Sequence, residues 1–144
     1  MSIYHDKLRV EFSDTDAAGI VHFANFFRYM ERVEHNFWRS LGLSVQSRVG
    51  DHEIGFPRVK VDCEYFAPAR FEDELDAALT LDKLGVKSIT FHIEFHRTGE
   101  LLARGHVIIV CCRVGRGGRL ESIEIPEPIR TPIADFVEPP GRDA

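Results

Sequence analysis

A regular hydrophobic period marks the stretch from Asn25 to Leu41. Apolar side chains recur there every three or four residues, while charged residues fill the other side. The apolar positions are Phe26, Met30, Val33, Phe37 and Leu41, with Phe27 and Trp38 widening the stripe. This spacing predicts an amphipathic α-helix of about 25 Å, calculated from a rise of 1.5 Å per residue. Asn25 is a candidate N-cap, and Gly42 is suited to end the helix.

A second pattern, the alternation of apolar and polar residues, predicts strands on both sides of this helix. The alternating stretches are Leu8–Phe12, Val59–Tyr65, Leu75–Leu81 and Ile89–Phe95, followed by a more continuously apolar stretch, Leu101–Val114. A lone helix among runs of strands is typical of the α+β class. We therefore expect an antiparallel sheet of about five strands that wraps around one long central helix.

The chain has 144 residues, which is a usual length for one domain. Its last part, from Pro126 onward, contains several prolines and ends in polar residues. We expect a single domain over residues 1–144, in which about residues 130–144 form a loosely attached tail.

The overall charge limits the class of partner. The formal net charge is −5, which argues against binding to nucleic acid or to an anionic membrane. The longest apolar run, Val107–Cys112, is far shorter than the ~20 residues of a membrane-spanning helix. Three cysteines, Cys63, Cys111 and Cys112, are too few and too poorly spaced for a disulfide scaffold or a zinc cluster. We expect a reduced, cytoplasmic protein without stable membrane insertion.

Two carboxylates, Asp14 and Asp16, lie just upstream of the predicted helix. Acidic residues are favoured in turns and at helix N-termini, so this placement alone does not require a catalytic function. The free N–H groups of a helix N-terminus can nevertheless hydrogen-bond a carbonyl oxygen as it becomes negative. A carboxylate beside them can attack that carbonyl or activate a water molecule. These groups suffice for a thioester, because a thiolate leaves without much help from a general acid.

The segment Asp14-Thr15-Asp16-Ala17-Ala18-Gly19-Ile20-Val21, followed by Asn25 and an aromatic-rich helix, resembles the signature of the 4-hydroxybenzoyl-CoA thioesterase family. These proteins are hotdog-fold acyl-CoA thioesterases, including those associated with the Tol–Pal system. Later segments that fit are Tyr65–Asp73, Gly85–Ser88 and Gly99–Ala103. The resemblance implies a hotdog fold and hydrolysis of an acyl-CoA to the free acid and CoA, without a cofactor.

The resemblance also assigns roles to individual residues. Asp16 matches the catalytic carboxylate, as nucleophile or general base, and the backbone N–H of Phe23 matches the group that polarises the thioester carbonyl. Asp14 matches the first acidic residue of the motif and is interpreted as a positioning residue. The substrate-binding positions are Gly19, His22, Asn25, Arg70, Lys87 and Ser88. The implied assembly is a homodimer, often paired again into a homotetramer, with the site between subunits.

Two other classes of function stay open. Many relatives have Tyr-His where this chain has His22-Phe23, and a backbone amide is present whatever the side chain at position 23. His22 is the only close acid–base partner for Asp16 in a hydratase or dehydratase that acts on enoyl thioesters. The other alternative is a module that binds acyl thioesters without catalysis.

Other polar residues have simpler interpretations. Glu31 and Glu34 on the predicted helix are interpreted as solvated or subunit-facing charges, although a related branch of hotdog thioesterases uses a helix glutamate. His92, Glu94 and His96 have a spacing that resembles metal ligands. The polar face of an exposed sheet gives the same pattern, so no metal is predicted.

Overall fold

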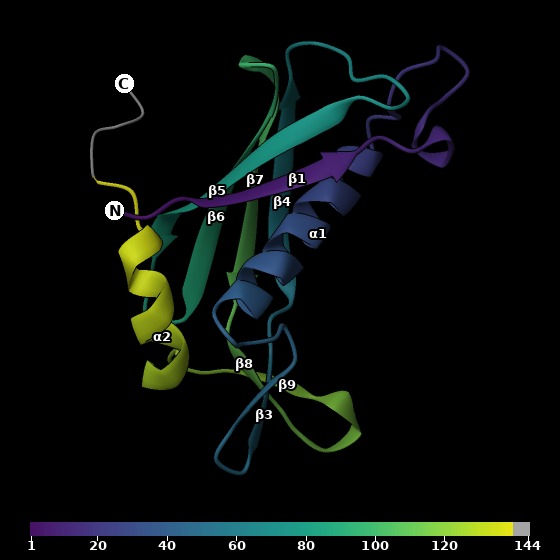
Figure 1. Cartoon of the computed structure of the whole chain (residues 1–144). Coiled ribbons are helices and arrows are strands. Elements are labelled where there is room, and N and C mark those ends of the chain that lie inside the picture. Colours follow the sequence, from purple (N-terminus) through teal and green to yellow (C-terminus); the bar gives the residue numbers. More distant parts are fainter. Residues whose placement is uncertain (140–144) are drawn as a thin grey trace.

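A five-stranded antiparallel sheet with one helix packed against it dominates the computed structural model, which describes residues 1–139 (Figure 1). The strands are β1 (Tyr4–Arg9), β4 (Arg58–Tyr65), β5 (Glu74–Leu84), β6 (Ser88–Arg97) and β7 (Glu100–Val110). Their order across the sheet is β1-β5-β6-β7-β4, so β1 and β4 are the edges. The predicted α+β class and the antiparallel sheet of five strands are confirmed.

Helix α1 (Asn25–Ser40) lies against one face of this sheet. Its buried residues are Phe26, Tyr29, Met30, Val33, Glu34, Phe37 and Trp38. Glu34 was expected to be a solvated or subunit-facing charge, and its burial contradicts that expectation. Ala24, not Asn25, is the N-cap residue. Gly42 follows the helix with φ of +73°, the left-handed conformation that glycine adopts without strain.

A small second sheet extends the end of the molecule beyond the large one. Its strands, in spatial order, are β2 (Ser47–Val49), β3 (His52–Gly55), β8 (Cys112–Val114) and β9 (Leu120–Ser122). The long strand predicted over Leu101–Val114 is therefore divided at Cys111. The N–H of Cys111 donates to the backbone oxygen of Lys87 at 2.7 Å, and the oxygen of Cys111 accepts from Ile123 at 2.9 Å. These bonds turn the chain out of β7 and into the second sheet.

The C-terminal segment is packed, which corrects the predicted loose tail as far as residue 139. Helix α2 (Glu127–Ile133) buries Ile129 and Ile133. The N–H of Glu138 donates to the oxygen of Leu81 on β5 at 2.8 Å, and the N–H of Ser2 donates to the oxygen of Asp135 at 2.8 Å. The part of the tail at residues 140–144 lies outside the described residues. Within residues 1–139, no helix is long and apolar enough to cross a membrane.

Candidate active site

Asp14 holds the loop that leads into α1 through four hydrogen bonds. Its Oδ2 accepts from the N–H of Glu11 at 2.9 Å and from the hydroxyl of Tyr29 at 2.8 Å. Its backbone oxygen accepts from the N–H of His22 at 2.9 Å and from Nδ2 of Asn25 at 2.8 Å. These contacts make Asp14 a positioning residue. They also explain why Asn25 is not a cap, because its side chain reaches back to the loop.

Asp16 lies half-buried in a tight bend of the same loop. Its Oδ1 accepts from the N–H of Ala18 at 2.9 Å. Its backbone N–H donates to the oxygen of Ile20, and its backbone oxygen accepts from Gly19, both at 2.9 Å. Gly19 has φ of +78°, which permits the bend. Among residues 1–139 no group hydrogen-bonds Oδ2 of Asp16, so this oxygen is available for chemistry.

An apolar hollow of about 500 Å³ opens beside Asp16. It is lined by Asp16, Ile20, Val21, Phe23, Phe26, Tyr65, Phe66, Ala67, Pro68 and Ala69. Backbone contacts join its two walls, since the N–H of Val21 donates to Ala69 at 2.8 Å and Ile20 forms a bridge with Arg70. Arg70 thus lies next to the hollow, although its side chain is exposed. A hollow of this size suits a small organic group.

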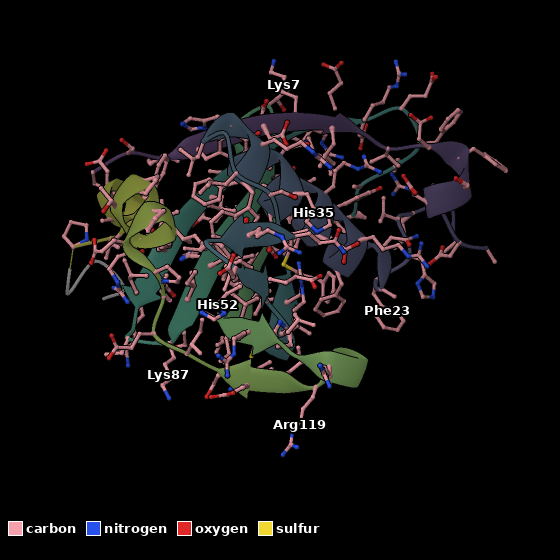
Figure 2. All side chains as sticks on the ribbon, turned by 90° about the horizontal axis from the view of Figure 1, so that it is seen from below. Lys7, Phe23, His35, His52, Lys87 and Arg119 are labelled. Atoms are coloured by element: carbon pink, nitrogen blue, oxygen red, sulfur yellow. The ribbon has the colours of Figure 1, made fainter. Side chains whose placement is uncertain are left out.

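The backbone amide of Phe23 lies in the turn just before α1, one residue ahead of the N-cap Ala24. The backbone oxygen of Phe23 accepts from the hydroxyl of Tyr65 at 2.8 Å and from the N–H of Phe26 at 3.4 Å. Its N–H takes part in none of the hydrogen bonds found among the described residues. The Phe23 side chain is 63% exposed and projects from the surface (Figure 2). A free amide at the positive end of a helix is suited to bind an oxyanion.

His22 supports the start of the helix instead of lining the hollow. Its ring stacks on the ring of Phe23, with centroids 4.6 Å apart. Its Nδ1 accepts from the N–H of Ala24 at 3.2 Å. The side chain is exposed and is not among the residues that line the hollow. His22 is therefore not part of the lining of the hollow, and its contact with substrate stays a prediction.

Lys87 and Ser88 lie far from Asp16 in the same chain. They precede or begin β6, and seven residues separate Ser88 from Phe95, which packs against a ring of the hollow. That separation corresponds to ~23 Å along a strand. Figure 2 shows Lys87 and Phe23 well apart. Lys87 and Ser88 are therefore apart from Asp16 within one chain, and their contact with substrate in a site between subunits stays a prediction.

Sequence analysis missed two parts of the site. The first is the wall formed after β4 by Tyr65 and the residues that follow it. A signal was present, because this segment matched the family pattern, but the pattern did not show that it faces the loop. The second is the bond between Tyr29 and Asp14. No local pattern indicates a partner fifteen residues away.

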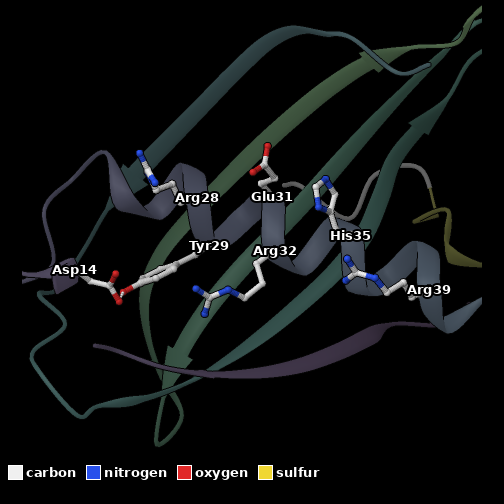
Figure 3. Close-up of a pocket in the computed structure, with 7 residues that line it drawn as sticks. All are labelled: Asp14, Arg28, Tyr29, Glu31, Arg32, His35 and Arg39. Carbon is white, nitrogen blue, oxygen red and sulfur yellow. Dashed lines mark hydrogen bonds between the residues drawn. The ribbon is translucent and has the colours of Figure 1, made fainter. Parts of the chain in front are cut away.

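A second hollow, of about 340 Å³, lies on the exposed side of α1 (Figure 3). It is lined by Asp14, Arg28, Tyr29, Glu31, Arg32, His35 and Arg39. Burial lowers the pKa of His35, and the nearby arginines act in the same direction while Glu31 opposes them. Glu31 faces this open hollow, in the middle of α1 and away from the free amide at its start. The hollow therefore lacks the pairing of carboxylate and amide found at Asp16.

Comparison with known proteins identifies the family. A model of the thioesterase-like superfamily matches residues 10–133. The chain belongs to the thioesterase-like superfamily. Its fold is the hotdog thioesterase fold, so the resemblance inferred from the loop motif is confirmed.

Several relatives of this superfamily member are CoA thioesterases by name. The structure of a gentisyl-CoA thioesterase is 32% identical with a TM-score of 0.76, and the match covers 92% of this chain and 99% of that one. A 1,4-dihydroxy-2-naphthoyl-CoA thioesterase from Synechocystis is 26% identical with a TM-score of 0.83, covering 96% and 100%. The acyl-CoA thioester hydrolase YbgC of Escherichia coli O6:H1 is 28% identical over 111 residues, covering 76% and 82%.

Proposed function

We propose that this protein hydrolyses an acyl-CoA to the free acid and CoA at the hollow beside Asp16. One observation supports the assignment of the site: Asp16 and Phe23 both line the same apolar hollow, and Oδ2 of Asp16 and the N–H of Phe23 each lack a hydrogen-bond partner among residues 1–139. A carboxylate and an oxyanion donor are the two groups that hydrolysis of a thioester needs. The names of the superfamily relatives support the acyl-CoA as substrate.

The reaction follows from this arrangement. The thioester carbonyl oxygen accepts a hydrogen bond from the N–H of Phe23, which stabilises the negative charge that develops on it. Asp16 then attacks the carbonyl carbon or takes a proton from an attacking water molecule. The C–S bond breaks and the CoA thiolate leaves. On the water route this gives the free acid directly; where Asp16 attacks, a water molecule then hydrolyses the acyl–Asp16 anhydride, which releases the free acid and restores the carboxylate. The N–H of Ala18 orients the carboxylate, and the hydroxyl of Tyr65 holds the carbonyl group of Phe23.

The hollow favours an aromatic acyl group. Its lining includes the rings of Phe23, Phe26, Tyr65 and Phe66. Phe26 and Tyr65 meet edge to face, with centroids 5.6 Å apart, which leaves ring faces and edges for a further ring to pack against. Two of the relatives are named for acyl groups that carry an aromatic ring. We expect aryl acyl-CoAs to be hydrolysed more efficiently than straight-chain ones.

A homodimer joined along β4, alone or as a dimer of dimers, would complete the site. Edge strand β4 and the residue after it expose large apolar side chains: Val59 (60%), Val61 (46%), Tyr65 (45%) and Phe66 (50%). A second copy packed there would bury these side chains and cover the open side of α1. The helix would then be enclosed, as expected for a central helix. Lys87 and Ser88 would contact substrate only from a neighbouring subunit.

The cysteines of this chain favour a reducing compartment. Cys63, Cys111 and Cys112 are free. Burial raises the pKa of the Cys111 thiol to about 11, with the neighbouring Cys112 acting in the same direction. A thiol in this state is a poor nucleophile for disulfide exchange. Residence in the cytoplasm is the proposal that fits these thiols.

The test is an assay of thiol release with aromatic, short-chain and long-chain acyl-CoAs. Asp16→Asn keeps an oxygen at the Oδ1 position for Ala18, so the loop should fold, and we expect kcat to fall about 100-fold or more. Asp51→Asn, in an exposed turn, is the matched control and should leave kcat unchanged. A parent protein inert to every thioester would contradict the activity. An unimpaired Asp16→Asn would contradict the site.

The same preparation separates the other classes of function. An enoyl-CoA that is consumed without release of thiol would indicate a hydratase. Saturable binding of acyl-CoA with no turnover, unchanged by Asp16→Asn, would indicate a binding module.

A further inference from the structure

Four polar residues line up across the face of the large sheet that is turned away from α1. Asp62 on β4 is opposite His106 on β7, His106 is opposite His92 on β6, and His92 is opposite Thr80 on β5. The neighbouring Gly105 points toward Met30 of α1, so His106 points to the other side. The proposed hydrolysis uses none of these residues.

Two histidines converge there on one carboxylate. Nδ1 of His92 is 3.2 Å from Oδ1 of Asp82, and Nε2 of His106 is 3.0 Å from Oδ2 of Asp82. The ligand atoms of these three residues all lie within 4.8 Å of one another. Glu138, from the C-terminal segment, places Oε2 3.9 Å from Nδ1 of His92. Ligand atoms of a tetrahedral zinc site are about 3.3 Å apart, since each bond is ~2.0 Å, so small movements suffice to close this set around an ion.

A carboxylate stands behind each imidazole ring. Oδ1 of Asp62 is 2.9 Å from Nδ1 of His106, and Oε2 of Glu94 is 3.0 Å from Nε2 of His92. Histidines that bind metal commonly donate their second N–H to such a carboxylate, which fixes the tautomer and the ring orientation. The outward nitrogens then hold the protons, and the inward nitrogens are left with free lone pairs.

His92 is the buried histidine of this cluster, with only 7% of its surface exposed. Its Nδ1 faces Asp82 and Glu138, while its Nε2 lies at ion-pair distance from Glu94 without a well-aligned hydrogen bond among residues 1–139. Four carboxylates surround the two histidines: Asp62, Asp82, Glu94 and Glu138. Even with both rings protonated, the cluster would carry excess negative charge. A divalent cation would offset this charge.

We propose that Asp82, His92 and His106, completed by Glu138, bind a divalent transition-metal ion of the zinc type. Two imidazole nitrogens and two carboxylate oxygens form a donor set that zinc accepts in tetrahedral geometry. The ligands come from β5, β6, β7 and the segment after α2. The ion therefore ties the C-terminal segment to the sheet and adds to the stability of the fold. The proposal departs from the expectation of no metal, which considered only His92, Glu94 and His96 along one strand.

The test uses full-length protein without a histidine tag, treated with chelator and titrated with Zn²⁺ by calorimetry. We expect one Zn²⁺ per chain and a higher Tm when it is bound.

His106→Gln should weaken Zn²⁺ binding at least about 10-fold, because losing a metal ligand costs more affinity than losing a residue that only supports a ligand. His96→Gln is the matched control, since His96 is on the same face of β6 but reaches only Glu94, at 3.6 Å; it should bind like the parent.

Two further measurements keep the result decisive. Co²⁺ should give the visible absorption of a tetrahedral site, and His106→Gln should abolish it while His96→Gln retains it. Glu138→Gln lies outside the strands, so it should weaken Zn²⁺ binding without disturbing the sheet. A parent protein that binds no Zn²⁺, or binding that is equal in the parent and in both the His106 and Glu138 variants, would overturn the proposal.

Discussion

The buried carboxylate of Glu34 pairs with the partly exposed Arg58 and so joins α1 to the first residue of β4. Oε1 of Glu34 accepts from Nη2 of Arg58 at 2.6 Å, and its Oε2 accepts from Nε1 of Trp38 at 3.1 Å. The Glu34 side chain has no exposed surface. Burial raises its pKa, while Arg58 and Trp38 oppose the rise. A charged group in this place depends on its partner, because an unpaired buried charge is strongly unfavourable.

We predict that Arg58→Met lowers the free energy of unfolding by about 2–3 kcal/mol at pH 7. The loss should be smaller at pH 5. A carboxyl whose pKa is raised on folding stabilises the folded state fully below its unfolded pKa, and this contribution is lost as pH rises through the folded pKa. Without Arg58 the pKa of Glu34 rises further, so protonation at pH 5 relieves the unpaired charge. Denaturant unfolding at both pH values measures the effect.

Matched variants support this measurement. The double variant Glu34→Gln with Arg58→Met has no buried charge and should recover part of the loss at pH 7. Arg104→Met removes an arginine from an exposed pair with Glu64 and should cost less than ~1 kcal/mol. Equal losses for Arg58→Met at pH 5 and pH 7 would contradict the explanation by charge.

Tyr29 should influence catalysis through Asp14. Burial raises the pKa of Tyr29, and its hydrogen bond to Asp14 adds to the rise, so the hydroxyl stays a donor. We predict that Tyr29→Phe costs about 1.5 kcal/mol of stability, as for a hydrogen bond to a charged acceptor. We also expect kcat to fall severalfold with little change in KM, because the loop that carries Asp16 loses an anchor. Steady-state kinetics and thermal unfolding test this, and an unchanged kcat would contradict it.

At the scale of elements, α1 packs tightly on the sheet at Gly105 of β7. A Cβ atom there would lie 2.5 Å from Sδ of Met30 and 2.6 Å from the backbone oxygen of Asp62. The sulfur can move, but the backbone oxygen belongs to the paired strand β4. Only glycine therefore lets α1 rest directly on the middle of the sheet.

We predict that Gly105→Ala destabilises the protein by about 1–3 kcal/mol, the usual range for overpacking. The matched control is Gly115→Ala. Gly115 has an ordinary negative φ of −96°, and a Cβ atom there would meet only the oxygen of Arg119 at 3.4 Å. Calorimetric unfolding of both variants gives the comparison. A free energy of unfolding for Gly105→Ala within 0.5 kcal/mol of the parent value, about the scatter of surface substitutions, would contradict the explanation by overpacking.

Elements that repeat a regular pattern were predictable, and those defined by distant contacts were not. The period over Asn25–Leu41 predicted α1 to within a residue, because one side of that helix is apolar. The break at Cys111 depends on bonds to Lys87 and Ile123, which no local pattern contains. Helix α2 was also not predictable, because the prolines in this segment indicated a loose tail although two of its isoleucines are buried.

The candidate site divides in the same way. Asp16 and Phe23 are seven residues apart, so one motif contained both, and they line one hollow. Its other wall comes from the segment after β4, which only the folded sheet brings near. Distance along the chain likewise separated His92 from His106, so their convergence on Asp82 was invisible to spacing.

At the scale of the whole molecule, the proposed dimer along β4 can be tested by placing a charged residue in its interface. We predict that Val61→Arg places a cation in the apolar interface, converts dimers to monomers and lowers kcat/KM at least about tenfold, since a charge buried at an interface costs several kcal/mol. His5→Arg, exposed on the opposite edge strand β1, is the control and should leave assembly unchanged. Sedimentation and the thiol-release assay measure both effects. A Val61→Arg protein that remains dimeric would contradict the interface.

The contact between Ser2 and Asp135 has a consequence for engineering. It brings the start of the chain beside the segment that follows α2 (Figure 1). A short flexible linker could therefore join Ser2 to the segment around Asp135, and the polypeptide could be cut open elsewhere. The exposed hairpin at Gly99, on the side of the sheet remote from α2, is a suitable place for the new termini. Such a circular permutant should retain the fold, and it would present a fused reporter near Pro68 of the hollow, whose backbone oxygen accepts from Arg97 at 3.2 Å.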